Sequence, residues 1–149
     1  MTTALYFEDF PAGHRYTTSA FCLSEDDIIG FARQNDPQPF HIDPEAARAS
    51  PYGGIIASGF QTLIEAFKRT LDEGGWAGAS MGSPGMEDIR WLAPVRPGDS
   101  LHVQAEVLEA RASASRPDRG FVKIRHDVLT PDNRLAMSYT ATHILRRRP

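Results

Sequence analysis

The C-terminal third of the chain alternates between apolar and polar residues in three successive stretches. These stretches cover residues 101–107, 122–128 and 135–145, and turn-forming residues separate them at 116–120 and 131–133. A period of two residues places alternate side chains on opposite faces of a β-strand, and strands joined by tight turns pair antiparallel. We therefore predict three consecutive strands of an antiparallel sheet with one face buried.

Residues 59–73 have the pattern of a long amphipathic helix. Apolar side chains recur at intervals of three and four along one side, and the pair Gly74–Gly75 provides a stop. The apolar side comprises Phe60, Leu63, Ile64, Phe67 and Leu71. Polar side chains take the opposite side, so the pattern predicts a helix that packs its apolar side on another layer.

Two further elements complete the predicted fold. Residues 24–35 have a helical pattern in which Ser24 is the N-cap and Asp27 the third helical residue of a near capping box, and residues 86–92 resemble a strand. A long helix and an antiparallel sheet together predict an α+β domain, with the helix across one face of the sheet. A length of 149 residues without a repeat or linker suits a single domain, 1–149.

Asp36 and His41 are five positions apart, with Pro37 and Pro39 between them. Each proline fixes its own φ and disfavours the α conformation for the preceding residue, so a stiff, extended loop is predicted over residues 36–43. A carboxylate and an imidazole on rigid backbone can exchange protons with one small molecule or one water. The alternative is a turn in which Asp36 caps backbone amides and His41 is an ordinary packed histidine.

Three motifs in the middle of the chain carry a family resemblance. They are Asp-Pro-Gln-Pro-Phe-His at 36–41, Asp-Pro-Glu-Ala-Ala at 43–47 and Gly-Gly-Ile-Ile-Ala-Ser-Gly at 53–59. Together they resemble the MaoC-like dehydratases, relatives of the (R)-specific enoyl-CoA hydratases. The family signature is Asp, any residue, Asn, Pro, an aliphatic residue and His; here Gln38 replaces Asn and Phe40 replaces the aliphatic residue.

This resemblance implies the hot-dog fold, in which the antiparallel sheet wraps around the long central helix. It also implies a hydro-lyase that adds water to a 2-enoyl thioester or removes it from a 3-hydroxyacyl thioester. Coenzyme A would be part of the substrate, and no separate cofactor is expected. Since hot-dog proteins typically pair their sheets edge to edge, we expect a homodimer or a multiple of dimers.

The resemblance also suggests roles for three residues. Asp36 is the expected base that takes a proton from water, and His41 is its partner, which orients the water and delivers a proton at C2. The two can exchange these roles, because a coupled pair titrates as a unit. Gly59, at the start of the long helix, is the expected donor of a backbone N–H to the thioester oxygen, where the helix dipole adds to the effect.

Two alternative functions stay open. A thioesterase of the same fold would place a carboxylate on or near the long helix, where Glu65 is the candidate. Glu65 is four residues before Arg69, however, and is more simply read as one half of a surface ion pair. A non-catalytic subunit that binds acyl thioesters would need only a groove, and would tolerate the loss of Asp36 or His41.

Composition argues against several other classes of protein. A net charge of -3 gives no indication of nucleic-acid binding. The five histidines lack close ligand spacing and the single cysteine excludes a thiolate cluster, so no metal site is predicted. His126 and His143 are in phase with apolar neighbours and are expected to be satisfied, packed histidines. No apolar run approaches the length of a membrane span and the N-terminus has no basic region, which favours a cytoplasmic location.

Overall fold

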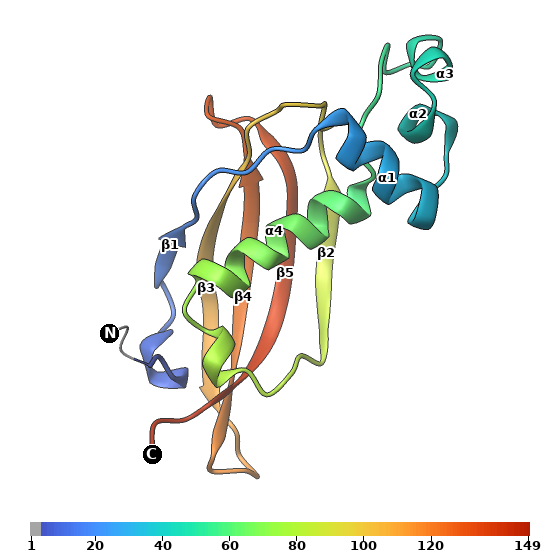
Figure 1. Cartoon of the computed structure of the whole chain (residues 1–149). Helices are drawn as coiled ribbons and strands as arrows, with labels where there is room; N and C mark the ends of the chain where they lie inside the picture. The colour runs from blue at the N-terminus through green and yellow to red at the C-terminus, as the bar shows by residue number, and fades with distance from the viewer. Residues whose placement is uncertain (1–3) are drawn as a thin grey trace.

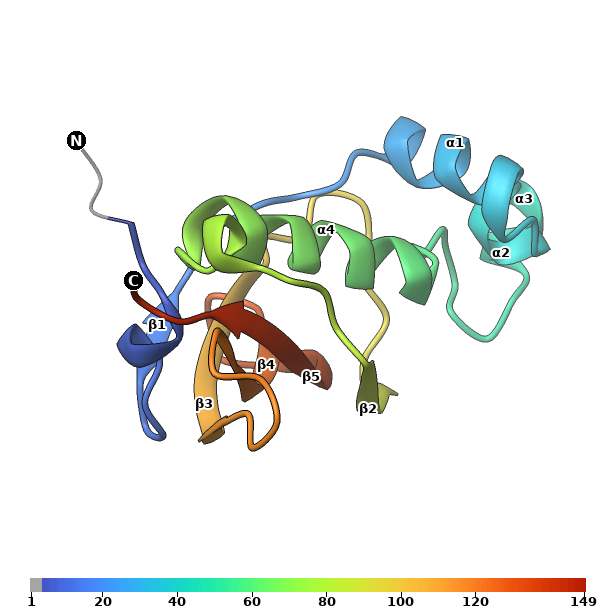
Figure 2. The same cartoon turned by 90° about the horizontal axis from the view of Figure 1, so that it is seen from below.

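One antiparallel β-sheet with helices on one side makes up the computed structural model, which describes residues 4–149 (Figure 1). The strands are β1 (Arg15–Thr17), β2 (Gly85–Trp91), β3 (His102–Ala112), β4 (Arg119–Leu129) and β5 (Leu135–Arg146). The α-helices are α1 (Glu25–Asn35), α2 (Pro39–Ile42), α3 (Pro44–Arg48) and α4 (Gly59–Glu73), and two short 3-10 helices cover Phe7–Asp9 and Ala77–Ala79. In Figure 2, α4 lies across one face of the sheet. The helices α1, α2 and α3 lie near the N-terminal end of α4. The predicted α+β architecture is confirmed, and no helix within residues 4–149 is long and apolar enough to cross a membrane.

The predicted meander is formed by β3, β4 and β5. Each strand is antiparallel to the next, with Ala105 opposite His126 and His126 opposite Tyr139. Within the described residues the sheet order is β1-β3-β4-β5-β2, so β1 and β2 are its edges. β1 was not predicted, because its three residues are too few to show a period of two.

α4 has the predicted bounds, but part of it faces an unexpected direction. The helix begins at Gly59, and Gly75 follows its end with a φ of 80°, which side-chain-bearing residues rarely adopt. Its buried residues are Gln61, Thr62, Ala66 and Thr70. Phe60 and Ile64 are 57% and 53% exposed, so the prediction that they pack on the sheet is wrong. Ala66 lies in the core with strand residues, and Leu63, Phe67 and Leu71 of the predicted apolar side pack against the core as predicted.

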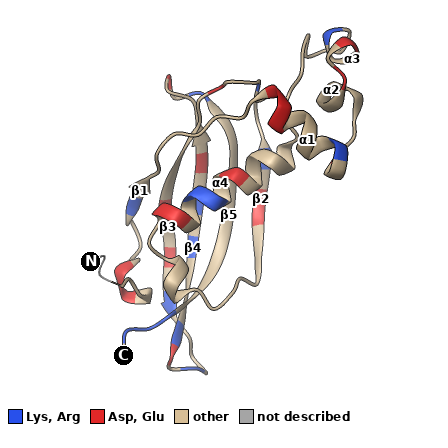
Figure 3. Cartoon of the chain, viewed as in Figure 1, with Lys and Arg blue, Asp and Glu red and all other residues tan. Residues whose placement is uncertain are grey.

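Exposed apolar side chains lie on the N-terminal half of α4 and along the edge strand β2 and its end. We call this set the apolar edge, and it comprises Phe60, Ile64, Met86, Ile89, Trp91 and Leu92. The Phe60 and Trp91 rings are in edge contact, with centroids 5.6 Å apart, and join the helix to the strand. The first turn of α4 carries no charge (Figure 3). Apolar surface of this kind commonly marks an interface.

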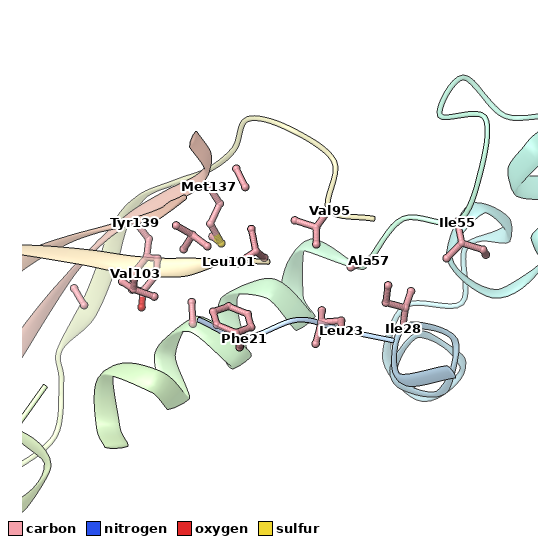
Figure 4. Packing of buried hydrophobic residues seen from close by; sticks show 14 of the residues in the cluster. Phe21, Leu23, Ile28, Ile55, Ala57, Val95, Leu101, Val103, Met137 and Tyr139 are labelled. Carbon is pink, nitrogen blue, oxygen red and sulfur yellow. The ribbon is translucent and has the colours of Figure 1, made fainter. Parts of the chain in front are cut away.

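A hydrophobic cluster joins α1, α2 and α3 to the sheet. It runs from Ile28 of α1 through Ala57 and Val95 to Met137 of β5 (Figure 4). The Ala57 N–H also donates to the Val95 carbonyl at 2.8 Å. The segment that leads into α4 is therefore fixed relative to both α1 and the sheet.

A second buried group, between the C-terminal half of α4 and the sheet, is polar. The His126 ring stacks on the Tyr139 ring with centroids 4.5 Å apart, and the ring centroids of His143 and Trp76 are 4.1 Å apart. Both histidines are buried as predicted, but in the described chain neither the ring nitrogens of His126 nor Nε2 of His143 has a hydrogen-bond partner. Burial lowers the pKa of His126 to about 3 and that of His143 to about 4. Both rings are therefore neutral at pH 7.

Candidate active site

Asp36 and His41 lie where α1 meets α2. Asp36 is the C-cap of α1, and its N–H donates to the Ala32 carbonyl at 2.8 Å. The predicted extended loop is wrong, because α2 occupies half of it. Pro39 takes the first position of α2, where its φ is suitable and its missing N–H is not needed. Gln38, the residue before it, keeps the extended backbone with φ -77° and ψ 143°.

The imidazole of His41 and the carboxylate of Asp36 face each other. His41 Nε2 lies 3.3 Å from Asp36 Oδ2, and the two side chains are 5% and 16% exposed. On the other side of the ring, Nδ1 lies 2.6 Å from the Ile56 carbonyl oxygen. That oxygen can only accept, so Nδ1 carries a hydrogen and Nε2 is the nitrogen whose proton can exchange.

Both oxygens of the Asp36 carboxylate have a neutral donor. The Ser58 hydroxyl donates to Oδ2 at 2.7 Å, and the Gln38 side-chain amide donates to Oδ1 at 2.7 Å. Burial acts to raise the pKa of Asp36 and is the largest single effect, but Gln38, Ser58 and His41 together hold it below its usual value. Asp36 is therefore ionised at neutral pH.

The N-terminus of α4 lies beside Asp36 and His41. Ser58 is the N-cap, and its hydroxyl accepts from the Phe60 N–H at 3.3 Å. The N–H of Gly59 makes no hydrogen bond within the described chain. The φ of Gly59 is not positive, and a Cβ there would overlap the Trp91 indole. Space beside Trp91, rather than backbone conformation, favours glycine at this position.

Asp36, His41 and Gly59 line one cavity of about 330 Å³. The structure thus brings together all three residues that the sequence singled out: Asp36, His41 and Gly59. The aromatic walls of the cavity are Phe40, Tyr52, Phe60 and Trp91. Within residues 4–149, no group of three or more His, Cys, Asp or Glu side chains is placed to hold a metal ion.

Glu65, the candidate carboxylate of the alternative thioesterase, does not line this cavity. Its predicted ion pair with Arg69 is also wrong, because Arg69 Nη1 lies 3.6 Å from the Glu73 carboxylate. Ser19 holds that carboxylate in place, with its N–H and hydroxyl donating at 2.8 and 2.7 Å. Arg69 therefore pairs toward the C-terminal end of the helix rather than toward Glu65.

Comparison with known proteins identifies the class to which this fold and site belong. Residues 7–128 match the family described as MaoC like domain, and the chain belongs to that family. The MaoC-like dehydratase from Rhodospirillum rubrum has a TM-score of 0.90 at 37% identity, covering 97% of this chain and 99% of that one. A conserved hypothetical protein from Mycobacterium tuberculosis with a double hotdog fold has a TM-score of 0.81 at 18% identity, covering 98% of this chain and 45% of that one. The hot-dog fold is thereby confirmed.

Two sequence relatives add to this assignment. The uncharacterized protein YdeM of Bacillus subtilis is 37% identical over 102 residues, which cover 68% of this chain and 72% of that protein. The 3-hydroxybutyryl-CoA dehydratase of Methylorubrum extorquens is 33% identical over 112 residues, 70% of this chain and 65% of that protein. The predicted resemblance is confirmed at the level of the family, which includes named dehydratases.

Proposed function

We propose that this protein adds water across the C2–C3 double bond of a 2-enoyl thioester, or removes it from the 3-hydroxyacyl thioester, with coenzyme A as the carrier. The observation that supports this most directly is the pair formed by Asp36 and His41, 3.3 Å apart in a cavity that also reaches the N-terminus of α4. A relative named as a 3-hydroxybutyryl-CoA dehydratase is consistent with such a substrate.

Hydration requires a hydroxyl group at C3 and a proton at C2. Asp36 takes one proton from a water molecule as the water oxygen bonds to C3, and His41, which starts the cycle with a hydrogen on both ring nitrogens, gives its Nε2 proton to C2. The proton on Asp36 then passes to His41 Nε2 across the 3.3 Å that separates them, which restores both groups. The Ile56 carbonyl supports this cycle because it binds Nδ1–H and leaves Nε2 as the exchanging atom.

Gly59 is the proposed donor to the thioester oxygen, where negative charge develops in the transition state. Its free N–H stands at the positive end of a 15-residue helix. Replacing Gly59 by Pro removes this donor, but the added Cβ would overlap Trp91. A clean test therefore compares the double variant Trp91→Ala/Gly59→Pro with Trp91→Ala alone.

We expect kcat of this double variant to fall below that of Trp91→Ala by about 10²–10³, the loss measured for one such donor in another enzyme. Proline is tolerated in the first turn of a helix, and the non-positive φ of Gly59 avoids strain. Circular dichroism should show that α4 persists. Equal rates in the two folded variants would place the donor elsewhere.

A panel of 2-enoyl-CoA esters of increasing chain length tests the proposed reaction. Loss of absorbance of the conjugated thioester, without release of free thiol, would support hydration. Release of free coenzyme A would instead indicate a thioesterase, and binding without turnover would indicate a binding subunit. Asp36 and His41 in the cavity, with Glu65 outside it, favour the first outcome.

We also propose that two copies of the chain pair through the apolar edge. All residues of β2 are exposed, and an exposed edge strand invites pairing with another strand. Light scattering at micromolar concentration should give at least twice the 16.5 kDa mass of one chain. Leu92→Glu, in the apolar edge, is expected to yield monomers, whereas the control Leu108→Glu, at a 41% exposed site on β3, should not. A fully active monomeric parent would contradict this proposal.

A further inference from the structure

Gln38 stands where the family signature has Asn, and the structure gives it a defined contact. Its Nε2 donates to Asp36 Oδ1 at 2.7 Å, while the rest of the side chain is exposed and lines the cavity. Gln38 is also the N-cap of α2, a position from which polar side chains commonly bond to helix amides. Its side chain makes no such bond. The amide of Gln38 therefore serves Asp36 rather than the helix that follows.

The contact constrains the carboxylate of Asp36. A carboxylate only accepts, so the Gln38 amide must present its NH₂ group to Oδ1. Ser58 donates to the other oxygen, Oδ2, which is also the one that faces His41. With one neutral donor on each oxygen, the carboxylate cannot turn without breaking a hydrogen bond. Gln38 is the donor that can be removed without disturbing the N-cap of α4.

We propose that Gln38 is a positioning residue that holds Asp36 ionised and turned toward His41, and thereby sets the lower pH limit of the reaction. His41, on α2, is the titratable group that faces Asp36, and Ser58, at the start of α4, is neutral. The C-terminal end of α1, which Asp36 caps, has the negative end of the helix dipole and opposes ionisation. Among the groups that lower the pKa of Asp36, Gln38 has the largest effect.

The first test needs no substrate, because the pKa of Asp36 can be followed by carbon NMR of its carboxyl group. Gln38→Ala removes the donor, and Gln38→Glu keeps the size of the side chain but replaces the donor by a second carboxylate. Loss of one hydrogen bond to a charged group should raise the pKa of Asp36 by about one unit in Gln38→Ala. The like charge should raise it further in Gln38→Glu. The control Gln34→Ala, an exposed glutamine on α1, should leave it unchanged.

The second test is the pH dependence of kcat/KM, and this part of the inference rests on the proposed function. Since Asp36 must be ionised to take a proton from water, the acid limb of the pH profile, measured where each variant is still folded, should move to higher pH by the same amounts and in the same order. An equal pKa of Asp36 in the parent and in Gln38→Ala would overturn the inference, as would an acid limb that stays in place while that pKa rises. A raised pKa in a protein that hydrates no enoyl thioester would preserve the role of Gln38 toward Asp36 and overturn the proposed function instead.

Discussion

Asp36→Asn and His41→Ala are each expected to hydrate a 2-enoyl-CoA at least about a hundredfold more slowly than the parent, because positioned acid–base groups typically contribute 10²–10⁴. Asparagine cannot take a proton from water, although it fills the same space between Gln38 and Ser58. Alanine at position 41 removes the nitrogen that we propose delivers the proton to C2. The measurement is kcat for hydration, at a pH where the parent is fully active.

The two variants differ in what they do to the fold. Asp36 lies partly open to the cavity, whereas His41 is 4% exposed and bonds to the Ile56 carbonyl, so His41→Ala also loses packing. Each rate should therefore be measured well below the melting temperature of that variant. Asp26→Asn, in the exposed first turn of α1, is the matched control and should be as active as the parent. Near-normal turnover by Asp36→Asn or by His41→Ala would remove the pair from the mechanism.

The free energy of unfolding is expected to fall by roughly 5 kcal/mol between pH 7 and pH 4.5 through His126 and His143 alone. Their pKa values are about 3 and about 4 in the folded protein, against about 6.5 in an unfolded chain. The unfolded state therefore binds more protons below pH 6.5, and stability is lost as the pH falls. The slope for each histidine reaches about 1.4 kcal/mol per pH unit only below pH 6.5, so each contributes roughly 2.5 kcal/mol between pH 7 and pH 4.5.

Urea unfolding at a series of pH values measures this loss. The double variant His126→Phe/His143→Phe replaces both rings by groups that do not titrate, beside the aromatic neighbours Tyr139 and Trp76. Its stability should fall much less between pH 7 and pH 4.5 than that of the parent. His102→Phe, at a half-buried site on β3, is the control and should keep the slope of the parent. If the double variant and the parent lose stability equally, other groups cause the acid sensitivity.

Local patterns in the sequence determined most of the secondary structure and the location of the candidate site. The N-cap Ser24, the helix over residues 59–73 and the strands of the meander all follow from periodicity and capping signals that act within a few residues. The five-residue spacing of Asp36 and His41 was also enough to bring them together, since one helix end and one short helix span it.

Contacts between distant segments could not be predicted in this way. Ser58 is 22 residues from Asp36, and its hydroxyl reaches that carboxylate only because the cluster around Ala57 fixes the start of α4 against α1. The serine itself carries an N-cap signal ahead of the helix, but nothing local shows that its hydroxyl has a second partner. Gln38 was visible as a departure from the family signature, whereas its bond to Asp36 was not.

Tertiary structure alone also decided the direction in which α4 turns its apolar side. A period of 3.6 residues shows that Phe60 and Ile64 share a side of the helix, but it does not show what that side meets. Ala66 lies in the core with strand residues, whereas Phe60 and Ile64 are left at the β2 edge. Sequence therefore determined which residues form the helix, and packing against the sheet decided which of them are buried, since burial depends on neighbours that lie far away along the chain.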